Sequence, residues 1–231
     1  MGILPVANRL LTREKKVALT FDDGPNPYFT PAILDVLKSE SCTATFFVIG
    51  RWAEQHPELL RRIANEGHIV GGHTYFHGGD RGRDPYHEFK KGNEVIERIL
   101  GEPVRYIRVP QVQYAKVDAG IPRSIELFET DLQSKIQRGQ VTVVGGSVAT
   151  LDWLRGVPSA FNKWIALRLL HPGAIIALHD GCEREKDLRT RPKGTLQMLP
   201  DFIRSVRERG YEFVSLRDPL LFQGKKIQLT R

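Results

Sequence analysis

The sequence has few cysteines and no long apolar run, and both absences exclude whole classes of protein. Its two cysteines, Cys42 and Cys182, are too few for a cysteine-rich zinc site or a disulfide framework. No apolar stretch approaches the roughly 20 residues that a membrane-spanning helix needs, so we do not expect an integral membrane protein. Repeats, low-complexity segments and linkers are also lacking. A single domain over residues 1–231 is therefore expected.

The chain carries an excess of positive charge, but the charge is not arranged as nucleic-acid-binding proteins arrange it. The net charge is +7, and the one dense cluster, residues 184–193, mixes both signs. No basic stripe is interleaved with aromatic residues, so we expect no nucleic-acid partner. In residues 1–16 a short apolar patch precedes the basic residues, the reverse of a signal peptide. We expect a monomer that is either cytoplasmic or exported with its leader removed.

Short β-branched apolar segments alternate with helical patterns along the whole chain. The predicted strands are residues 17–21, 43–49, 68–71, 105–109, 141–145, 174–178 and 212–216. The predicted helices are residues 32–39, 57–67, 85–101, 122–139, 158–173 and 195–209. This alternation predicts an α/β fold with a parallel sheet and helical crossovers. A closed or nearly closed barrel suits it better than the alternative, an open doubly wound sheet.

Polar and titratable residues follow five of the predicted strands, where the active site of a parallel barrel lies. They are Asp22 and Asp23, His73 and His77, Arg108, Asp152, and His179. Chance would scatter such residues over both ends of the strands. Cys182 follows His179 closely, but we interpret it as an ordinary thiol in a loop.

The spacing of His73 and His77 at i and i+4 lets one turn direct both imidazoles at a common point. One carboxylate from the Asp22-Asp23 pair would complete a set of two histidines and one aspartate, which is typical of a catalytic divalent-metal site. The other aspartate would take a proton from the attacking water. Two surface histidines, and a carboxylate that caps the Asp-Gly-Pro turn, are the alternatives.

Three further residues suit the proton transfers of such a site. His179 would act as the general acid, and Asp152 would orient its imidazole and support its charged form. Arg108 would hold the general base ionised through a charge-assisted hydrogen bond. For each of them taken alone, an ordinary ion pair is an equal alternative.

Together these motifs resemble those of the NodB-type polysaccharide deacetylases (carbohydrate esterase family 4). TFDDGP at residues 20–25 and the histidine motif at residues 73–77 match the family's first two motifs in full. Parts of the third, fourth and fifth motifs match at Arg108 and Pro110, at Asp152-Trp153 and at His179-Asp180. The motifs occur in the family's order and cover most of the chain.

The resemblance implies a distorted (β/α) barrel with about seven parallel strands and one divalent metal. Zinc is the expected ion, with cobalt or another divalent ion as alternatives. The resemblance assigns the metal to Asp23, His73 and His77, the general base to Asp22 with Arg108, and the general acid to His179 with Asp152. Trp153 would wall the pocket for the acetyl methyl group. We place Leu178 and Gln111 in the same substrate pocket.

The activity implied is removal of N-acetyl groups from amino sugars in a chitin oligomer, peptidoglycan or a related glycan. Several positions depart from the family's pattern, namely Gln111, Val112, Ala149 and Ala177. The stretch after Pro110 normally supplies a backbone N–H to the reacting oxygen, so its change bears on catalysis. The alternatives are a catalytically impaired protein that binds metal and glycan, and a related C–N hydrolase that acts on a small amide.

Overall fold

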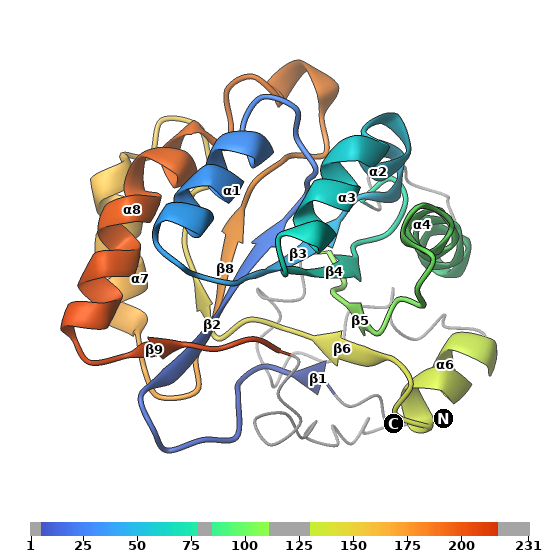
Figure 1. The fold of residues 1–231 in the computed structure, drawn as a ribbon, viewed down its shortest axis with the longest axis horizontal. Helices are drawn as coiled ribbons and strands as arrows, with labels where there is room; N and C mark the ends of the chain where they lie inside the picture. Colours follow the sequence, from blue (N-terminus) through green and yellow to red (C-terminus); the bar gives the residue numbers. More distant parts are fainter. Residues whose placement is uncertain (1–5, 78–84, 111–129, 217–231) are drawn as a thin grey trace.

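A curved parallel sheet organises the residues that the computed structural model describes, which are 6–77, 85–110 and 130–216 (Figure 1). Its strands are β1 (Val6–Ala7), β2 (Lys16–Asp22), β3 (Thr45–Val48), β4 (Ile69–Gly72), β5 (Tyr106–Ile107), β6 (Thr142–Val144), β7 (Val148–Ala149), β8 (Ile175–His179) and β9 (Glu212–Phe213). The helices are α1 (Thr30–Ser39), α2 (Gly50–Gln55), α3 (Pro57–Asn65), α4 (Pro85–Leu100), α6 (Thr130–Gln137), α7 (Ser159–Leu169) and α8 (Lys193–Glu208), with a 3₁₀ turn, η2 (Glu185–Asp187).

The strand order is β1-β6-β5-β4-β3-β2-β8-β7, with β9 beside β2, and every strand pair is parallel. The chain after β1 runs across to the other side of the sheet, where Arg9 pairs with Ala174 just before β8. The N–H of Leu10 donates to the carbonyl of Gly173 at 2.7 Å. This crossing joins the β6 side to the β8 side, as expected for a distorted (β/α) barrel.

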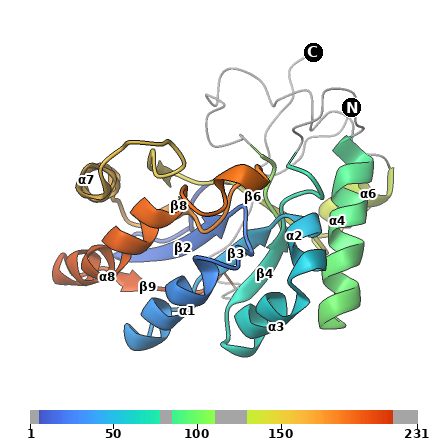
Figure 2. The same cartoon turned by 90° about the horizontal axis from the view of Figure 1, so that it is seen from above.

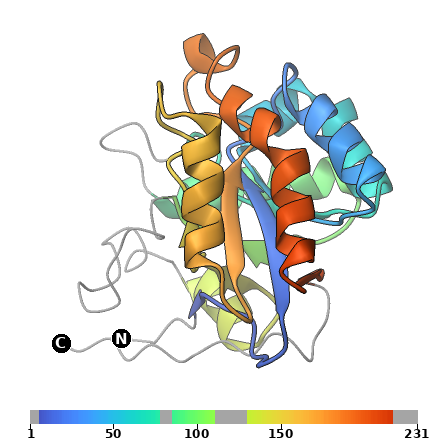
Figure 3. The same ribbon diagram turned by 90° about the vertical axis from the view of Figure 1, so that its left-hand side faces the viewer.

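Helices cover the convex face of the sheet in a continuous arc. Contacts run from α7 to α8, then to α1, α3 and α4. Figure 2 shows this arc around β2, β3 and β4, and Figure 3 shows α7 and α8 side by side against β8 and β2. No helix in the described part of the chain combines the length and apolar character that crossing a bilayer requires.

Side chains alternate between two apolar clusters, as the two faces of a strand dictate. In β2, Leu19 and Phe21 belong to the large cluster under the helices, whereas Ala18 belongs to a smaller cluster inside the curve with Phe47 and Ile175. Each large apolar side chain that becomes fully buried contributes about 1.5–3 kcal/mol. The core therefore stabilises the sheet beneath the strand ends.

The seven strands and six helices expected from the sequence are present, with shifted ends. The strands β1 and β7 were not predicted, because two residues are too short to show an alternating pattern. The short α2 and η2 were not predicted either, because six and three residues are too few to show a helical period. The first part of the helix predicted at 122–139 lies outside the described residues. Gly67 and Gly210 end α3 and α8 with φ values of 85° and 79°, as the sequence indicated.

Candidate active site

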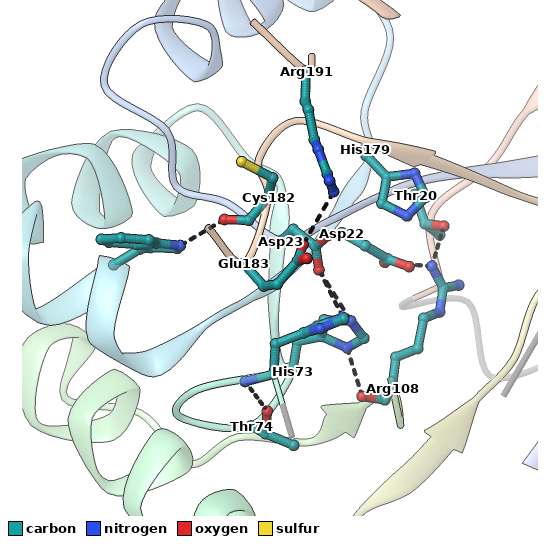
Figure 4. Close-up of polar contacts among 12 residues, drawn as sticks. Thr20, Asp22, Asp23, His73, Thr74, Arg108, His179, Cys182, Glu183 and Arg191 are labelled. Atoms are coloured by element: carbon teal, nitrogen blue, oxygen red, sulfur yellow. Dashed lines mark hydrogen bonds and ion pairs between the residues drawn. The ribbon is translucent and has the colours of Figure 1, made fainter. Parts of the chain in front are cut away.

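The three predicted metal ligands meet at the carboxyl end of the sheet. Asp23 follows β2, and His73 and His77 follow β4. The Oδ1 atom of Asp23 lies 3.4 Å from Nε2 of His73 and 3.2 Å from Nε2 of His77. One ligand atom from each residue lies within 4.8 Å of the other two. Figure 4 shows the imidazole of His73 directed at the Asp23 carboxylate.

The backbone in these two loops adopts conformations that direct the side chains. Asp23, Thr74 and His77 have φ values of 74°, 67° and 67°, in the left-handed region that costs a non-glycine residue free energy. The N–H of His77 donates to Thr74 Oγ1 at 2.8 Å, which stabilises the turn. The Nδ1 atom of His73 donates to the carbonyl of Arg108 at 2.7 Å. That bond leaves Nε2 as the ring's lone-pair atom, facing Asp23.

The chemistry of this cluster fits a divalent cation. Asp23 Oδ1 is buried and accepts no hydrogen bond from the residues that the structure describes, which is costly for a carboxylate oxygen. Burial alone would raise the pKa of Asp23, but His77, His73 and His179 in their protonated forms hold it far below its ordinary value, so the group is ionised. Burial lowers the pKa of His77, which favours the neutral imidazole that binds metals. Two nitrogens and one carboxylate oxygen suit zinc or a similar ion.

Asp22 is paired with a buried arginine beside this cluster. Arg108, 2% exposed, donates from Nη1 to Asp22 Oδ1 and to Thr20 Oγ1, both at 2.7 Å. Its Nη2 donates to the carbonyl of Gly145 at 2.7 Å, and the guanidinium lies 4.2 Å from the Phe47 ring centroid. Burial lowers the pKa of Arg108, and the Asp22 carboxylate opposes that effect. The guanidinium therefore supplies a positive charge at the Asp22 carboxylate.

His179 and Asp152 form the second charged pair. The Nδ1 atom of His179 donates to Asp152 Oδ1 at 2.9 Å, and the backbone N–H of His179 donates to Oδ2 at 2.8 Å. Hydroxyls of Thr150 and Thr195 donate to the same two oxygens, at 2.8 Å and 2.7 Å. Burial opposes a charge on His179, but the Asp152 carboxylate more than offsets it and raises the pKa to about 10. The imidazolium is therefore the stable form at neutral pH.

Two threonines that hold Asp152 were not predicted from the sequence. Thr150 lies two positions before Asp152, and a threonine hydroxyl commonly bonds to the backbone N–H two residues further on, as it does here at 3.3 Å, so a local signal existed. Thr195 comes from α8 and has no local signal. Thr20 has no role in the sequence beyond its place in the TFDDGP motif, and in the structure its hydroxyl accepts a hydrogen bond from Arg108.

Trp153, Leu178 and Gln111, the residues expected in the substrate pocket, do not share one environment in the structure. Trp153 is half-buried in the loop after β7, directly after Asp152, and its pocket role stays a prediction. The expectation for Leu178 needs correction. Its side chain is fully buried in the large cluster beneath the helices, because neighbouring strand residues face opposite sides. Ala177 pairs with Ala149 across β8 and β7, on the face that carries His179. Gln111 and Val112 lie outside the described residues.

Cys182 is an ordinary thiol, as predicted from the sequence. It is 1% exposed and packs with Ile49, Trp52 and Leu188. Burial raises the pKa of the thiol to about 12, so it is not a nucleophile at neutral pH. The backbone carbonyl of Cys182 accepts a hydrogen bond from the Trp52 indole at 3.0 Å, which ties this loop to α2.

The register of the sheet joins these groups into one site, because Asp22 lies opposite His179 in the β2–β8 pairing. A proton acceptor, a proton donor and a metal-ligand cluster thus lie together at the carboxyl end of the sheet. These are the elements from which a site for metal-assisted hydrolysis is built. The fold and the site define a metal-dependent hydrolase of the (β/α) barrel class.

Comparison with known proteins identifies the family. The sequence model of the polysaccharide deacetylase family matches residues 10–120. A peptidoglycan-N-acetylglucosamine deacetylase of Bacillus cereus is 35% identical over 218 residues, covering 91% of this chain and 70% of that protein. A chitooligosaccharide deacetylase of Rhizobium leguminosarum bv. trifolii is 35% identical over 210 residues, covering 88% and 91%. The chain belongs to the polysaccharide deacetylase family, and the resemblance seen in the motifs is confirmed.

Solved structures agree with this assignment. The crystal structure of a peptidoglycan N-acetylglucosamine deacetylase superposes with a TM-score of 0.74 at 30% identity, covering 97% of this chain and 96% of that one. A family 4 acetyl xylan esterase from Clostridium thermocellum in complex with a cobalt ion has a TM-score of 0.66 at 26% identity, covering 87% and 88%. These matches confirm the predicted distorted barrel. The family and the Asp23-His73-His77 cluster together indicate a divalent-metal cofactor.

Proposed function

We propose that this protein removes N-acetyl groups from the amino sugars of a glycan such as a chitin oligomer or peptidoglycan. The proposal rests on one observation, which is that three groups lie together at the carboxyl end of the sheet. They are the Asp22–Arg108 ion pair, the Asp152–His179 ion pair and the Asp23-His73-His77 cluster. The substrate class is supported by the relatives described above, which are named as deacetylases of peptidoglycan N-acetylglucosamine and of chitooligosaccharides.

We propose zinc as the metal, with cobalt as the alternative. Asp23, His73 and His77 would hold it, and their two nitrogens and one oxygen suit either ion. A bound divalent cation would polarise the acetyl carbonyl and lower the pKa of the attacking water.

Asp22 on β2 and His179 on β8 would then transfer the protons. Asp22 accepts a proton from the water as its oxygen bonds to the acetyl carbon, and Arg108 keeps this carboxylate in place through the 2.7 Å contact. The C–N bond breaks as His179 donates its Nε2 proton to the departing nitrogen. Asp152 keeps Nδ1 protonated and the ring oriented. The products are acetate and a free amine on the sugar. Trp153 would lie against the acetyl methyl group.

The test is acetate release from an N-acetylglucosamine oligomer. The protein is stripped with a chelator, divided, and supplied with zinc, cobalt or no metal. Release that stops on stripping and returns with metal supports the proposal. The matched control is Asp22→Asn, which keeps the shape of the side chain but cannot act as a base. If wild-type protein binds one equivalent of metal and releases no acetate, the impaired-protein or small-amide alternative replaces the proposal.

A further inference from the structure

Asp180 is a buried carboxyl group beside the site to which the reaction assigns no step. It follows His179 at the end of β8 and is 0% exposed. Its Oδ2 accepts a hydrogen bond from Thr30 Oγ1 at 2.5 Å, and the same hydroxyl accepts one from the backbone N–H of Asn26 at 2.7 Å. Thr30 and Asn26 are also 0% exposed. This bridge links the end of β8 to the loop between β2 and α1.

The bridge encloses the segment that carries the metal ligand Asp23. A Cβ atom on Gly24 would lie 2.1 Å from Asp180 Oδ2, so the carboxyl group packs directly on the Gly24 backbone. A Cβ atom on Gly181 would lie 2.0 Å from the carbonyl oxygen of Asp23. The N–H groups of Asp180 and Gly181 donate to the carbonyl of Asp22 at 3.1 and 3.3 Å. The backbone on either side of the Asp23 side chain therefore packs closely against Asp180 and Gly181.

Asp23 needs such enclosure, because its backbone is in the left-handed region at a φ of 74°. Non-glycine residues keep that conformation only where the surroundings enforce it. If the neighbouring segment relaxed, the Asp23 side chain would turn away from the two imidazoles. The contact between Asp180 and Gly24 opposes such relaxation.

Burying the carboxyl group of Asp180 in this space costs free energy. Its Oδ1 is buried without a hydrogen-bond partner among the residues that the structure describes. Burial, together with the nearby carboxylates of Asp23 and Asp22, raises the pKa of Asp180 to about 7 against the Thr30 hydrogen bond. An apolar side chain of similar size would avoid this cost but would lose the bond to Thr30. The feature that sets Asp180 apart is therefore the bridge.

We propose that Asp180 is a positioning residue for the metal site, in which its hydrogen bond to Thr30 holds Gly24 and so directs the Asp23 carboxylate at His73 and His77. The inference rests on the proposed function in one respect, which is that this cluster binds a divalent metal. It assigns Asp180 no contact with substrate and no proton transfer.

The experiment measures the affinity of chelator-stripped protein for Co²⁺, by titration followed in the visible absorption of the bound ion. The variants are Asp180→Ala, Asp180→Asn, Thr30→Val and Thr30→Ser. We expect Asp180→Ala and Thr30→Val to weaken the Kd by about 10- to 100-fold, the usual effect of losing a residue that orients a metal ligand. Asp180→Asn keeps an oxygen that can accept the hydrogen bond, and Thr30→Ser keeps the hydroxyl that donates it. Both variants should bind Co²⁺ with a Kd within a few-fold of that of wild type. The double variant Asp180→Ala/Thr30→Val should be little worse than either single one, because both remove the same bridge.

The matched control is Asp187→Asn. Asp187 is likewise buried, at 2% exposed, and lies in the loop after β8, but it pairs with Arg155 and Arg191. Its variant should bind Co²⁺ like wild type. Equal loss of affinity in Asp187→Asn would mean general destabilisation and would overturn the inference, as would wild-type affinity in folded Thr30→Val. The test is independent of acetate release: a wild-type protein that binds Co²⁺ without turnover defeats the proposed activity alone.

Discussion

Replacing Asp152 by asparagine should deprive His179 of its function as the general acid while leaving the Asp23-His73-His77 cluster intact. Each carboxylate oxygen of Asp152 accepts two hydrogen bonds, one from His179 and one from a threonine hydroxyl. Asparagine has one carbonyl oxygen, so its amide group must face two of these donors. The backbone N–H of His179 cannot reverse, and the carbonyl will therefore turn toward it. The amide N–H then faces Nδ1, which becomes an acceptor, and the ring loses its charge.

The size of the effect follows from the pKa of His179, which the Asp152 carboxylate raises to about 10 against burial. Without that carboxylate, even an ordinary imidazole with a pKa of about 6.5 is protonated in roughly a quarter of molecules at pH 7. Burial lowers this fraction further. Loss of the proton and of ring orientation together should reduce kcat/KM by about a hundred- to ten-thousand-fold, the usual contribution of a general acid.

The assay is kcat/KM for acetate release between pH 5 and 11, at matched metal content. The alkaline limb of the Asp152→Asn profile should lie at lower pH than that of wild type, because the acid loses its proton sooner. A bound cation lowers the pKa of His179 in both proteins and leaves the direction unchanged. Thr195→Val is the control, because it removes one hydrogen bond and keeps the carboxylate, and it should cost less than tenfold. An Asp152→Asn protein within threefold of wild type, with an unshifted profile, would refute the reasoning.

Four further outcomes are expected. Asp22→Asn should lower acetate release by at least about a hundredfold with unchanged metal content, because the amide cannot accept the proton. His77→Ala should weaken Co²⁺ binding by more than about tenfold in the absorption titration, whereas His56→Ala, outside the cluster, should not. Arg108→Met should lower the free energy of unfolding by about 3–5 kcal/mol in urea, because Asp22 remains buried without its partner. The metal-free protein should lose stability in thermal unfolding as pH rises from 6.5 through about 10, the interval in which folded His179 still holds a proton that the unfolded chain has released.

Each of these has an outcome that contradicts it. Full activity in Asp22→Asn would mean that another residue is the general base. Unchanged Co²⁺ affinity in His77→Ala would mean that His77 is not a metal ligand. A loss below about 1 kcal/mol for Arg108→Met would mean that Asp22 finds another partner. A His179→Gln protein that loses as much stability as wild type above pH 6.5 would assign the effect to another group.

The sequence by itself determined the alternation of strands and helices and the position of the chemical residues along it. Both are local properties, since a buried strand is written as a short apolar run and a helix end as a proline or glycine. Because parallel strands end at one edge, the order of motifs was enough to predict that Asp22, Asp23, His73, His77 and His179 converge.

Only the tertiary structure decided which groups complete the site. Thr195 reaches Asp152 from α8, and Thr30 reaches Asp180 from the start of α1, over separations that leave no pattern in the sequence. The face to which Leu178 points depends on the register of β8, and a shift of one residue exchanges it with Ala177. The strands β1 and β7 exist because the sheet supplies their hydrogen-bond partners, and two residues alone carry no preference strong enough to reveal them.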